Sequence, residues 1–200
     1  MKTFLRKTPV LISAVLITLS CSKENSAPAP VTATSNVQEE NFFEGFLTST
    51  SFSQKTTSNV NESDYEFGFE FEPLVKGKIT VLKVKLPDIR NDLKVTIWDK
   101  LTGNILRTEI LNVSAVNTVF TFDIIDLELV KNKQYAITMN SNDFYFRSKS
   151  NDSPITYPIT VGNFKILSNK YILGATQTYP TTELFSYCNG DLSFNFLKTE

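Results

Sequence analysis

Between residues 65 and 73 the chain alternates aromatic side chains with acidic or small ones at a period of two. One face of an extended chain would carry Tyr65, Phe67, Phe69 and Phe71, and the other Glu66, Gly68, Glu70 and Glu72. A strand with one apolar and one polar face is typical of an antiparallel sheet that packs on a core and faces solvent on the other side. We therefore expect an all-β domain in which the glutamate face of this strand points outward.

Similar apolar alternation continues along the chain. It predicts further strands at residues 82–86, 93–98, 105–111, 120–124, 135–139, 144–146, 164–167, 171–176 and 192–196. The turn residues 99–104 predict a hairpin, and Ile79 and Val81, which are out of phase with Leu82, predict a bulge or a change of sheet. No amphipathic helix or internal repeat is evident. About nine or ten strands at this spacing predict an antiparallel β-sandwich, jelly-roll-like in arrangement.

The N-terminus reads as an export signal. Lys2, Arg6 and Lys7 precede an apolar stretch at residues 10–19, and Ser20 stands before Cys21. About ten apolar residues are too few to cross a bilayer core of roughly 30 Å, so cleavage is favoured over a membrane span. Residues 1–20 are predicted to be a signal peptide. Residues 21–40, rich in Ser, Thr, Ala and Pro, are predicted to be a flexible linker, and residues 41–200 the β-sandwich domain.

The residues around Cys21 resemble a known class of signal. The run Ile17-Thr18-Leu19-Ser20-Cys21 resembles the lipobox of bacterial lipoproteins, with Thr18 where leucine is usual, and the resemblance implies acylation of Cys21. An ordinary secretory signal with an incidental cysteine is the alternative. The following Ser22-Lys23-Glu24-Asn25 resembles the start of Bacteroidota surface lipoproteins. The resemblance implies an outer-membrane protein, anchored through lipid and exposed at the cell surface, or otherwise facing the periplasm.

Short motifs within the domain resemble an uncharacterised β-sandwich family of bacterial extracellular proteins. They are Phe71-Glu72-Pro73, Gly77-Lys78-Ile79, the strand ending at Trp98, Tyr179-Pro180-Thr181 and Asp191-Leu192-Ser193-Phe194. These stand for the family's F-x-P, G-x-I, F-P-T and D-x-x-F pattern. The family usually has a tryptophan near the end, where this chain has Tyr187-Cys188-Asn189-Gly190. The resemblance implies an accessory module that binds or adheres, and no particular reaction.

Composition excludes several function classes. The chain has no histidine, which removes the commonest general base and most zinc sites. A net charge of −1 does not attract nucleic acid. We therefore expect no enzyme, no cofactor and no nucleic-acid partner.

Two groups of residues are candidates for ligand binding. Trp98 is out of phase with Val95 and Ile97, so it either forms an exposed aromatic platform for a sugar or packs beneath a loop. Amide, carboxylate and phenol groups that can pair with sugar hydroxyls gather further along the chain, although hairpin tips often contain such residues. These are Asn142, Asp143, Tyr145, Arg147 and Tyr157, with Asn151 and Asp152 between them.

Acidic residues and a lone thiol offer weaker hypotheses. Asp123, Asp126 and Glu128 carry oxygen ligands suited to Ca²⁺, but no D-x-D-x-D-G loop is present, and solvated carboxylates or a glycosidase pair are the alternatives. We expect no metal site. Cys188 has no partner if Cys21 is acylated, and a buried, inert thiol is favoured over a nucleophile.

These features predict a lipid-anchored envelope or cell-surface binding module. Glycan is the first candidate ligand. The alternative is a structural or assembly lipoprotein that binds another envelope protein, and a hydrolase is the weakest candidate.

Overall fold

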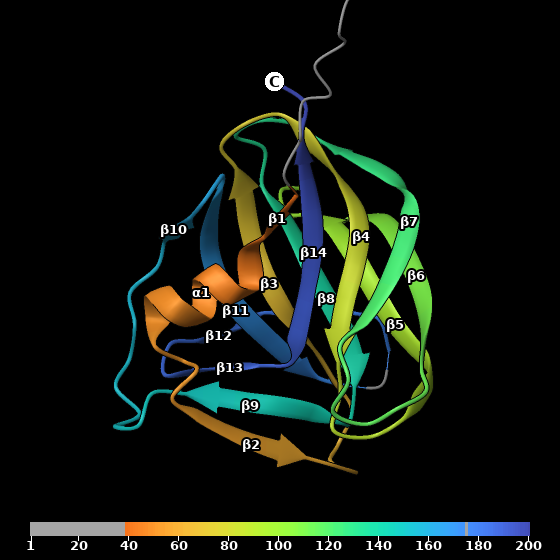
Figure 1. Cartoon of the computed structure of the whole chain (residues 1–200), viewed down its shortest axis with the longest axis vertical. Helices are drawn as coiled ribbons and strands as arrows, with labels where there is room; N and C mark the ends of the chain where they lie inside the picture. Colours follow the sequence, from red (N-terminus) through yellow and green to blue (C-terminus); the bar gives the residue numbers. More distant parts are fainter. Residues whose placement is uncertain (1–38, 175) are drawn as a thin grey trace, which may run out of the picture. The chain divides into compact units, whose positions relative to one another are not determined.

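The computed structural model describes residues 39–174 and 176–200, and these form an antiparallel β-sandwich (Figure 1). Cys21, the signal peptide and the linker up to residue 38 lie outside the described residues. The front sheet has four strands. In spatial order they are β1 (Glu40–Asn41), β14 (Asp191–Lys198), β4 (Gly77–Lys85) and β7 (Phe120–Leu129).

A larger sheet packs behind the front sheet. Its order is β10 (Ile159–Val161), β11 (Phe164–Leu173), β3 (Tyr65–Pro73), β8 (Tyr135–Ser141), β5 (Arg90–Asp99) and β6 (Ile105–Val113), with β12 (Thr182–Leu184) pairing β11. A small sheet of β13 (Tyr187–Asn189), β9 (Phe144–Ser148) and β2 (Lys55–Asn59) lies across one end of the sandwich. The C-terminus lies at the other end (Figure 1).

Aromatic rings from both sheets form the core. Phe71 of β3 and Phe194 of β14 meet between the sheets with ring centroids 5.2 Å apart. Phe164 of β11 packs edge-on against Phe196 at 4.7 Å. These distances fall in the favourable range for aromatic pairs, about 4.5–7 Å. The period-two pattern therefore placed the aromatic face of β3 correctly.

One helix was missed by the sequence analysis. α1 (Phe42–Thr50) begins at Asn41, whose side chain accepts a hydrogen bond from the Phe43 amide. It buries Phe42, Phe43 and Phe46 against one side of the sandwich. Its Gly, Thr and Ser residues have low helix propensity, so packing of these rings rather than intrinsic preference stabilises it.

The outward direction assigned to the glutamate face of β3 is wrong. Glu66 is 0% and Glu70 3% exposed. Residues 176–181, which we call the covering segment, pass over this face. In it Tyr179 donates a hydrogen bond to Glu70 (2.7 Å), and Gln177 donates one to Thr108 on β6 (2.8 Å). β3 therefore has two buried faces, one apolar and one polar.

Other differences concern the ends and edges of strands. The predicted bulge is confirmed, since the pairing of β4 with β7 shifts register between Ile79 and Val81. The two strands predicted at 164–176 form the single strand β11, with a bulge after Ile166. The described residues contain 14 strands rather than nine or ten. The additional ones are short pieces such as β1, β10, β12 and β13, in which a periodic pattern cannot develop.

The only helix of the described residues is nine residues long. None in this part of the chain has the length and apolar character needed to cross a membrane.

Candidate functional site

Trp98 does not form the exposed platform considered from the sequence. It is 4% exposed, and its indole Nε1 donates a hydrogen bond to Thr138 Oγ1 at 2.8 Å. Tyr179 of the covering segment packs edge-on against it, with ring centroids 5.6 Å apart. The alternative interpretation, packing beneath a loop, is correct, and the indole presents no open face on which a sugar could stack.

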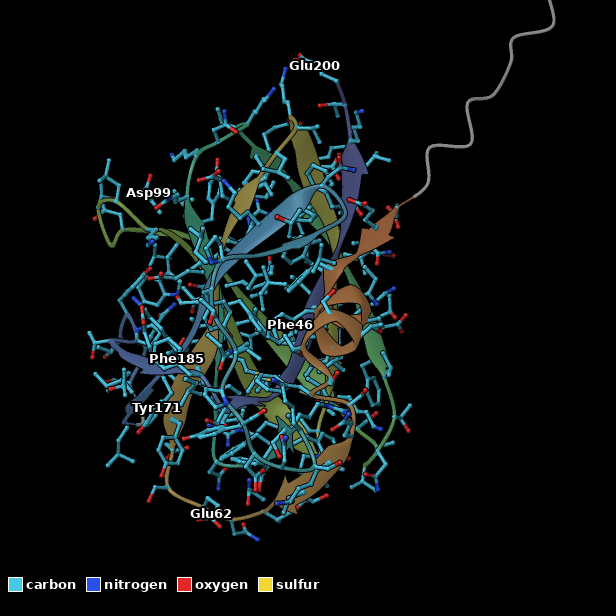
Figure 2. All side chains as sticks on the ribbon, turned by 90° about the vertical axis from the view of Figure 1, so that its left-hand side faces the viewer. Phe46, Glu62, Asp99, Tyr171, Phe185 and Glu200 are labelled. Carbon is cyan, nitrogen blue, oxygen red and sulfur yellow. The ribbon has the colours of Figure 1, made fainter. Side chains whose placement is uncertain are left out.

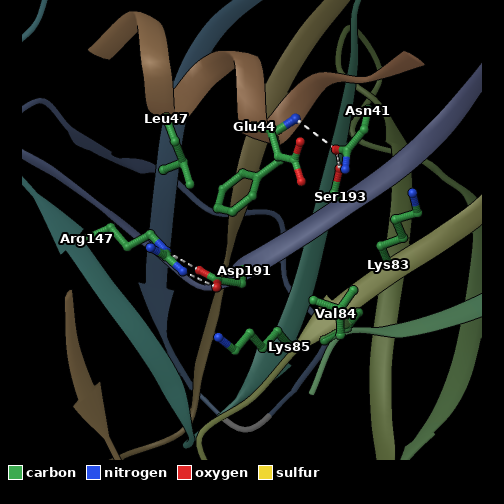
Figure 3. A pocket seen from close by; sticks show the side chains of 11 residues that line it. Asn41, Glu44, Leu47, Lys83, Val84, Lys85, Arg147, Asp191 and Ser193 are labelled. Atoms are coloured by element: carbon green, nitrogen blue, oxygen red, sulfur yellow. Dashed lines mark hydrogen bonds and ion pairs between the residues drawn. The ribbon is translucent and has the colours of Figure 1, made fainter. Parts of the chain in front are cut away.

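Tyr145 and Arg147 lie on the interior face of β9. Tyr145 is 4% exposed, and its hydroxyl donates a hydrogen bond to Asn117 Oδ1. The Arg147 guanidinium makes two bonds of 2.5 Å to the Asp191 carboxylate, where β14 begins. Figure 3 shows this pair in a hollow beside α1, with Lys85 close by. The Arg147 guanidinium and the Asp191 carboxylate therefore bind each other and join the small sheet to the front sheet.

Asn142 and Asp143 hold loops in place. The Asp143 carboxylate, 5% exposed, accepts a hydrogen bond of 2.7 Å from the backbone N–H of Asn61. Asn142 Oδ1 accepts one of 2.6 Å from Arg90. These contacts occupy one oxygen of each of the two side chains that the sequence analysis assigned to a ligand.

In the described structure, Tyr157 packs against α1 and has no ring contact with the loops of Asn142 and Asp143. Its ring is stacked on Phe46 of α1 with centroids 6.5 Å apart. Burial raises the pKa of its phenol well above the usual value, and the buried hydroxyl has no hydrogen-bond partner among the described residues. The six residues singled out for ligand binding thus do not converge on one site.

The acidic candidates on β7 also remain apart. Asp126 pairs with Lys78 at 2.5 Å. Within residues 39–174 and 176–200, no three acidic or cysteine side chains gather in a way that would hold a metal ion. Cys188 is fully buried, and this burial raises the pKa of its thiol.

The structure shows a different candidate site, which we call the aromatic hollow. It lies where the small sheet meets the ends of β3 and β11, and it encloses about 260 Å³. Its lining residues are Asn59, Glu62, Tyr65, Phe144, Phe146, Tyr171, Tyr187 and Asn189. Tyr171 and Glu62 mark its position toward the end of the domain opposite Glu200 (Figure 2).

Two sheets supply the rings of the aromatic hollow. Tyr65 at the start of β3 and Tyr171 of β11 belong to the large sheet, with ring centroids 6.0 Å apart. Phe146 of β9 and Tyr187 of β13 belong to the small sheet and stack at 4.4 Å. All four are only partly buried, so each ring retains some surface open to solvent.

The base of the aromatic hollow is more buried than its rim. Phe144 is 6% and Asn189 8% exposed, whereas Glu62 on the connection from β2 to β3 is exposed. The Oδ1 atom of Asn189 is buried and has no hydrogen-bond partner in the described part of the chain. A buried, unpaired polar atom costs about 1–3 kcal/mol, and because this oxygen has essentially no accessible surface it belongs to the packing beneath the hollow rather than to the surface that a ligand would contact.

Three tyrosines of the lining influence one another electrostatically. The pKa of Tyr187 is raised, first by burial and then by its proximity to Tyr171 and Tyr65. The hollow therefore combines ring surfaces with several hydroxyl and amide groups that both donate and accept hydrogen bonds.

Sequence reasoning missed this site because its residues come from four separate stretches of chain. Tyr65 and Phe146 were assigned to strands, and Tyr187 to a departure from a family motif, but nothing local showed that they meet. The one available signal was the number of tyrosines at strand ends, at positions 65, 171 and 187.

Comparison with known protein families and with characterised proteins finds no match to this chain. The resemblance to a β-sandwich family of extracellular proteins therefore stays a prediction.

Proposed function

We propose that the protein is a lipid-anchored module of the bacterial cell envelope that binds glycan in the aromatic hollow. The observation that carries this proposal is the grouping of four partly exposed aromatic rings with the Glu62 carboxylate and the Asn59 amide around one hollow. A sugar has apolar C–H faces that pack on aromatic rings and a rim of hydroxyls that pair with amides, carboxylates and phenols. The lining offers both kinds of partner.

The size of the hollow limits what it can take. Ligand pockets usually enclose about 300–1,000 Å³, so the volume of about 260 Å³ inside this open hollow is room for about one sugar ring below its rim. We infer that one sugar residue of a glycan enters the hollow and that the rest of the glycan stays outside.

The position of the hollow within the domain agrees with an anchored binding module. The first described residue, Glu39, precedes β1, which pairs with the C-terminal half of β14. The small sheet lies at the opposite end of the sandwich (Figure 1). If residues 21–40 form a flexible linker from acylated Cys21, the chain enters the domain at the end opposite the hollow, so the point of entry leaves the hollow uncovered.

Binding without catalysis suits the lining better than hydrolysis does. Most glycosidases need two carboxyl groups on either side of the scissile bond. Glu62 is the single carboxylate among the described residues of the hollow. We therefore propose a binding protein rather than an enzyme.

A glycan array probed with the full-length protein in detergent tests the proposal. We expect at least one glycan to bind, and Tyr171→Ala to weaken its binding by about tenfold or more, because a ring at the centre of a small interface carries much of the affinity. Phe185→Ala is the matched control, since it removes a ring that is 44% exposed outside the hollow (Figure 2).

The melting temperatures of both variants decide how a loss of binding is interpreted. Tyr171→Ala should melt close to Phe185→Ala, since its ring is only partly buried. If no glycan binds, or if affinity is lost only in step with stability, the glycan proposal fails. An assembly lipoprotein that contacts another envelope protein then becomes the better proposal.

A further inference from the structure

The aromatic hollow has an asymmetric charge. Its lining contains the Glu62 carboxylate and, among the described residues, no lysine or arginine. Aromatic rings also present a negative face, which repels anions and attracts cations. The ring faces and the carboxylate therefore give the hollow a negative electrostatic potential.

Basic residues on the same strands do not offset this charge. Lys170 precedes Tyr171 on β11, so its side chain lies on the opposite face of the sheet, where it forms an ion pair with Glu70 at 2.9 Å. Arg147 follows Phe146 on β9 and likewise points away, to Asp191.

The basic side chains on adjoining segments also form ion pairs with acidic residues outside the hollow. Lys55 at the far end of β2 pairs with Asp152 at 3.5 Å. Arg90 bonds Asp92 at 2.9 Å and also Asn142. None of these four side chains lines the hollow.

We infer that the aromatic hollow accepts a sugar residue without an acidic group, neutral or amino, and that Glu62 excludes uronic, sialic and sulfated residues. The inference rests on the proposed glycan binding and specifies its ligand. An anion placed in the hollow would lose water, meet ring faces of the same sign and approach Glu62 without a basic partner. A hydroxyl or amide N–H of an uncharged sugar can instead donate to the exposed Glu62 carboxylate.

The test compares wild type, Glu62→Gln, Glu62→Lys and Tyr171→Ala on an array that carries neutral, amino and acidic glycans. The relevant signals are those that Tyr171→Ala abolishes, since they arise in the hollow. In wild type these should come from glycans without an acidic group at the bound residue. The acidic counterpart of the same sugar, such as galacturonate for galactose, should bind on the order of tenfold more weakly.

The Glu62 variants separate charge from shape. Glu62 is exposed, so neither replacement threatens the fold. We expect Glu62→Lys to strengthen binding of the acidic counterpart several-fold, while Glu62→Gln, which keeps the size and removes the charge, gives a smaller gain. Added salt should reduce the effect of Glu62→Lys.

Each outcome distinguishes this inference from the proposed function. Signals that depend on Tyr171 and come equally from acidic glycans would overturn the charge selection and leave glycan binding in place. An unchanged ratio of acidic to neutral binding in Glu62→Lys would have the same meaning. A complete lack of signals that depend on Tyr171 would instead overturn the glycan proposal itself.

Discussion

At the scale of single residues, Glu66 is the most unusual side chain of the described domain. It is fully buried on the outer face of β3, where Thr138 donates a hydrogen bond to its Oε1 and its Oε2 has no partner. Burial raises the pKa of this carboxyl from 4.5 to about 7. The hydrogen bond from Thr138 and, to a smaller extent, the charge of Lys94 lower this pKa but do not cancel the effect of burial.

This shift predicts a loss of stability as the pH rises. Between pH 4.5 and about 7 the unfolded chain releases the proton of Glu66 while the folded protein keeps it, so unfolding becomes more favourable. The free energy of unfolding should fall by up to about 3 kcal/mol over this range, at about 1.4 kcal/mol per unit of pKa. Below pH 4.5 Glu66 is protonated in both the folded and the unfolded chain, so the stability that is lost at higher pH is fully present there.

Glu66→Gln supplies the control, because its amide cannot ionise. In urea titrations across this pH range, wild type should lose more stability than Glu66→Gln. Parallel pH profiles of the two proteins would show that Glu66 titrates normally.

Glu70, two positions along the same face, behaves in the opposite way. Burial by itself would raise its pKa, but hydrogen bonds from Lys170, Tyr179 and Ser168 together lower it. Two glutamates with equivalent places in the sequence pattern therefore have pKa values shifted in opposite directions, because Glu70 has basic and hydroxyl partners and Glu66 lacks a basic hydrogen-bond partner.

At the scale of elements, the small sheet is held to the sandwich by a buried ion pair. Arg147 of β9 and Asp191 of β14 are 15% and 7% exposed in their side chains. Removing one partner of such a pair leaves a buried charge without compensation. The small sheet also carries Phe146 and Tyr187, so its attachment sets the geometry of the aromatic hollow.

We expect Arg147→Ala to lower the free energy of unfolding by about 3–5 kcal/mol in a urea titration. Lys55→Ala, which breaks an exposed pair with Asp152 on the same sheet, should cost at most about 1 kcal/mol. Equal losses in the two variants would mean that the Arg147 pair is as weak as a surface pair.

The covering segment is the second element whose role depends on its contacts. It meets the outer face of the large sheet through polar bonds from Gln177 and Tyr179 and through the edge of Trp98. The Tyr179 ring, together with the Trp98 hydrogen bond to Thr138 on β8, explains why Trp98 is buried and offers no access for a ligand.

At the scale of the whole molecule, the open prediction concerns the anchor. Cys21→Ser should abolish labelling of the protein by a radioactive or clickable fatty acid and release it from the membrane fraction. Each acyl CH₂ buried in lipid contributes about 0.8 kcal/mol, and no helix in the described residues could replace that anchor by spanning the membrane. Retention and labelling at wild-type levels in Cys21→Ser would refute the lipoprotein assignment.

The sequence by itself determined the strands of the core and their apolar faces. The alternation of Phe67, Phe69 and Phe71 with glutamate specifies an extended chain with one aromatic side, and this is a property of neighbouring residues alone. The bulge near Thr80 and the hairpin from β5 to β6 were likewise predictable, because phase breaks and turn residues are local signals.

Only the tertiary structure decided what covers the other side of β3 and where a ligand could bind. Glu70 is buried because Tyr179, more than a hundred positions later, folds over it. The aromatic hollow likewise needs Tyr65, Phe146 and Tyr187 to converge from three strands. Such convergence depends on which strands pair and on the path of the segments between them, and the period of any single strand carries no record of either.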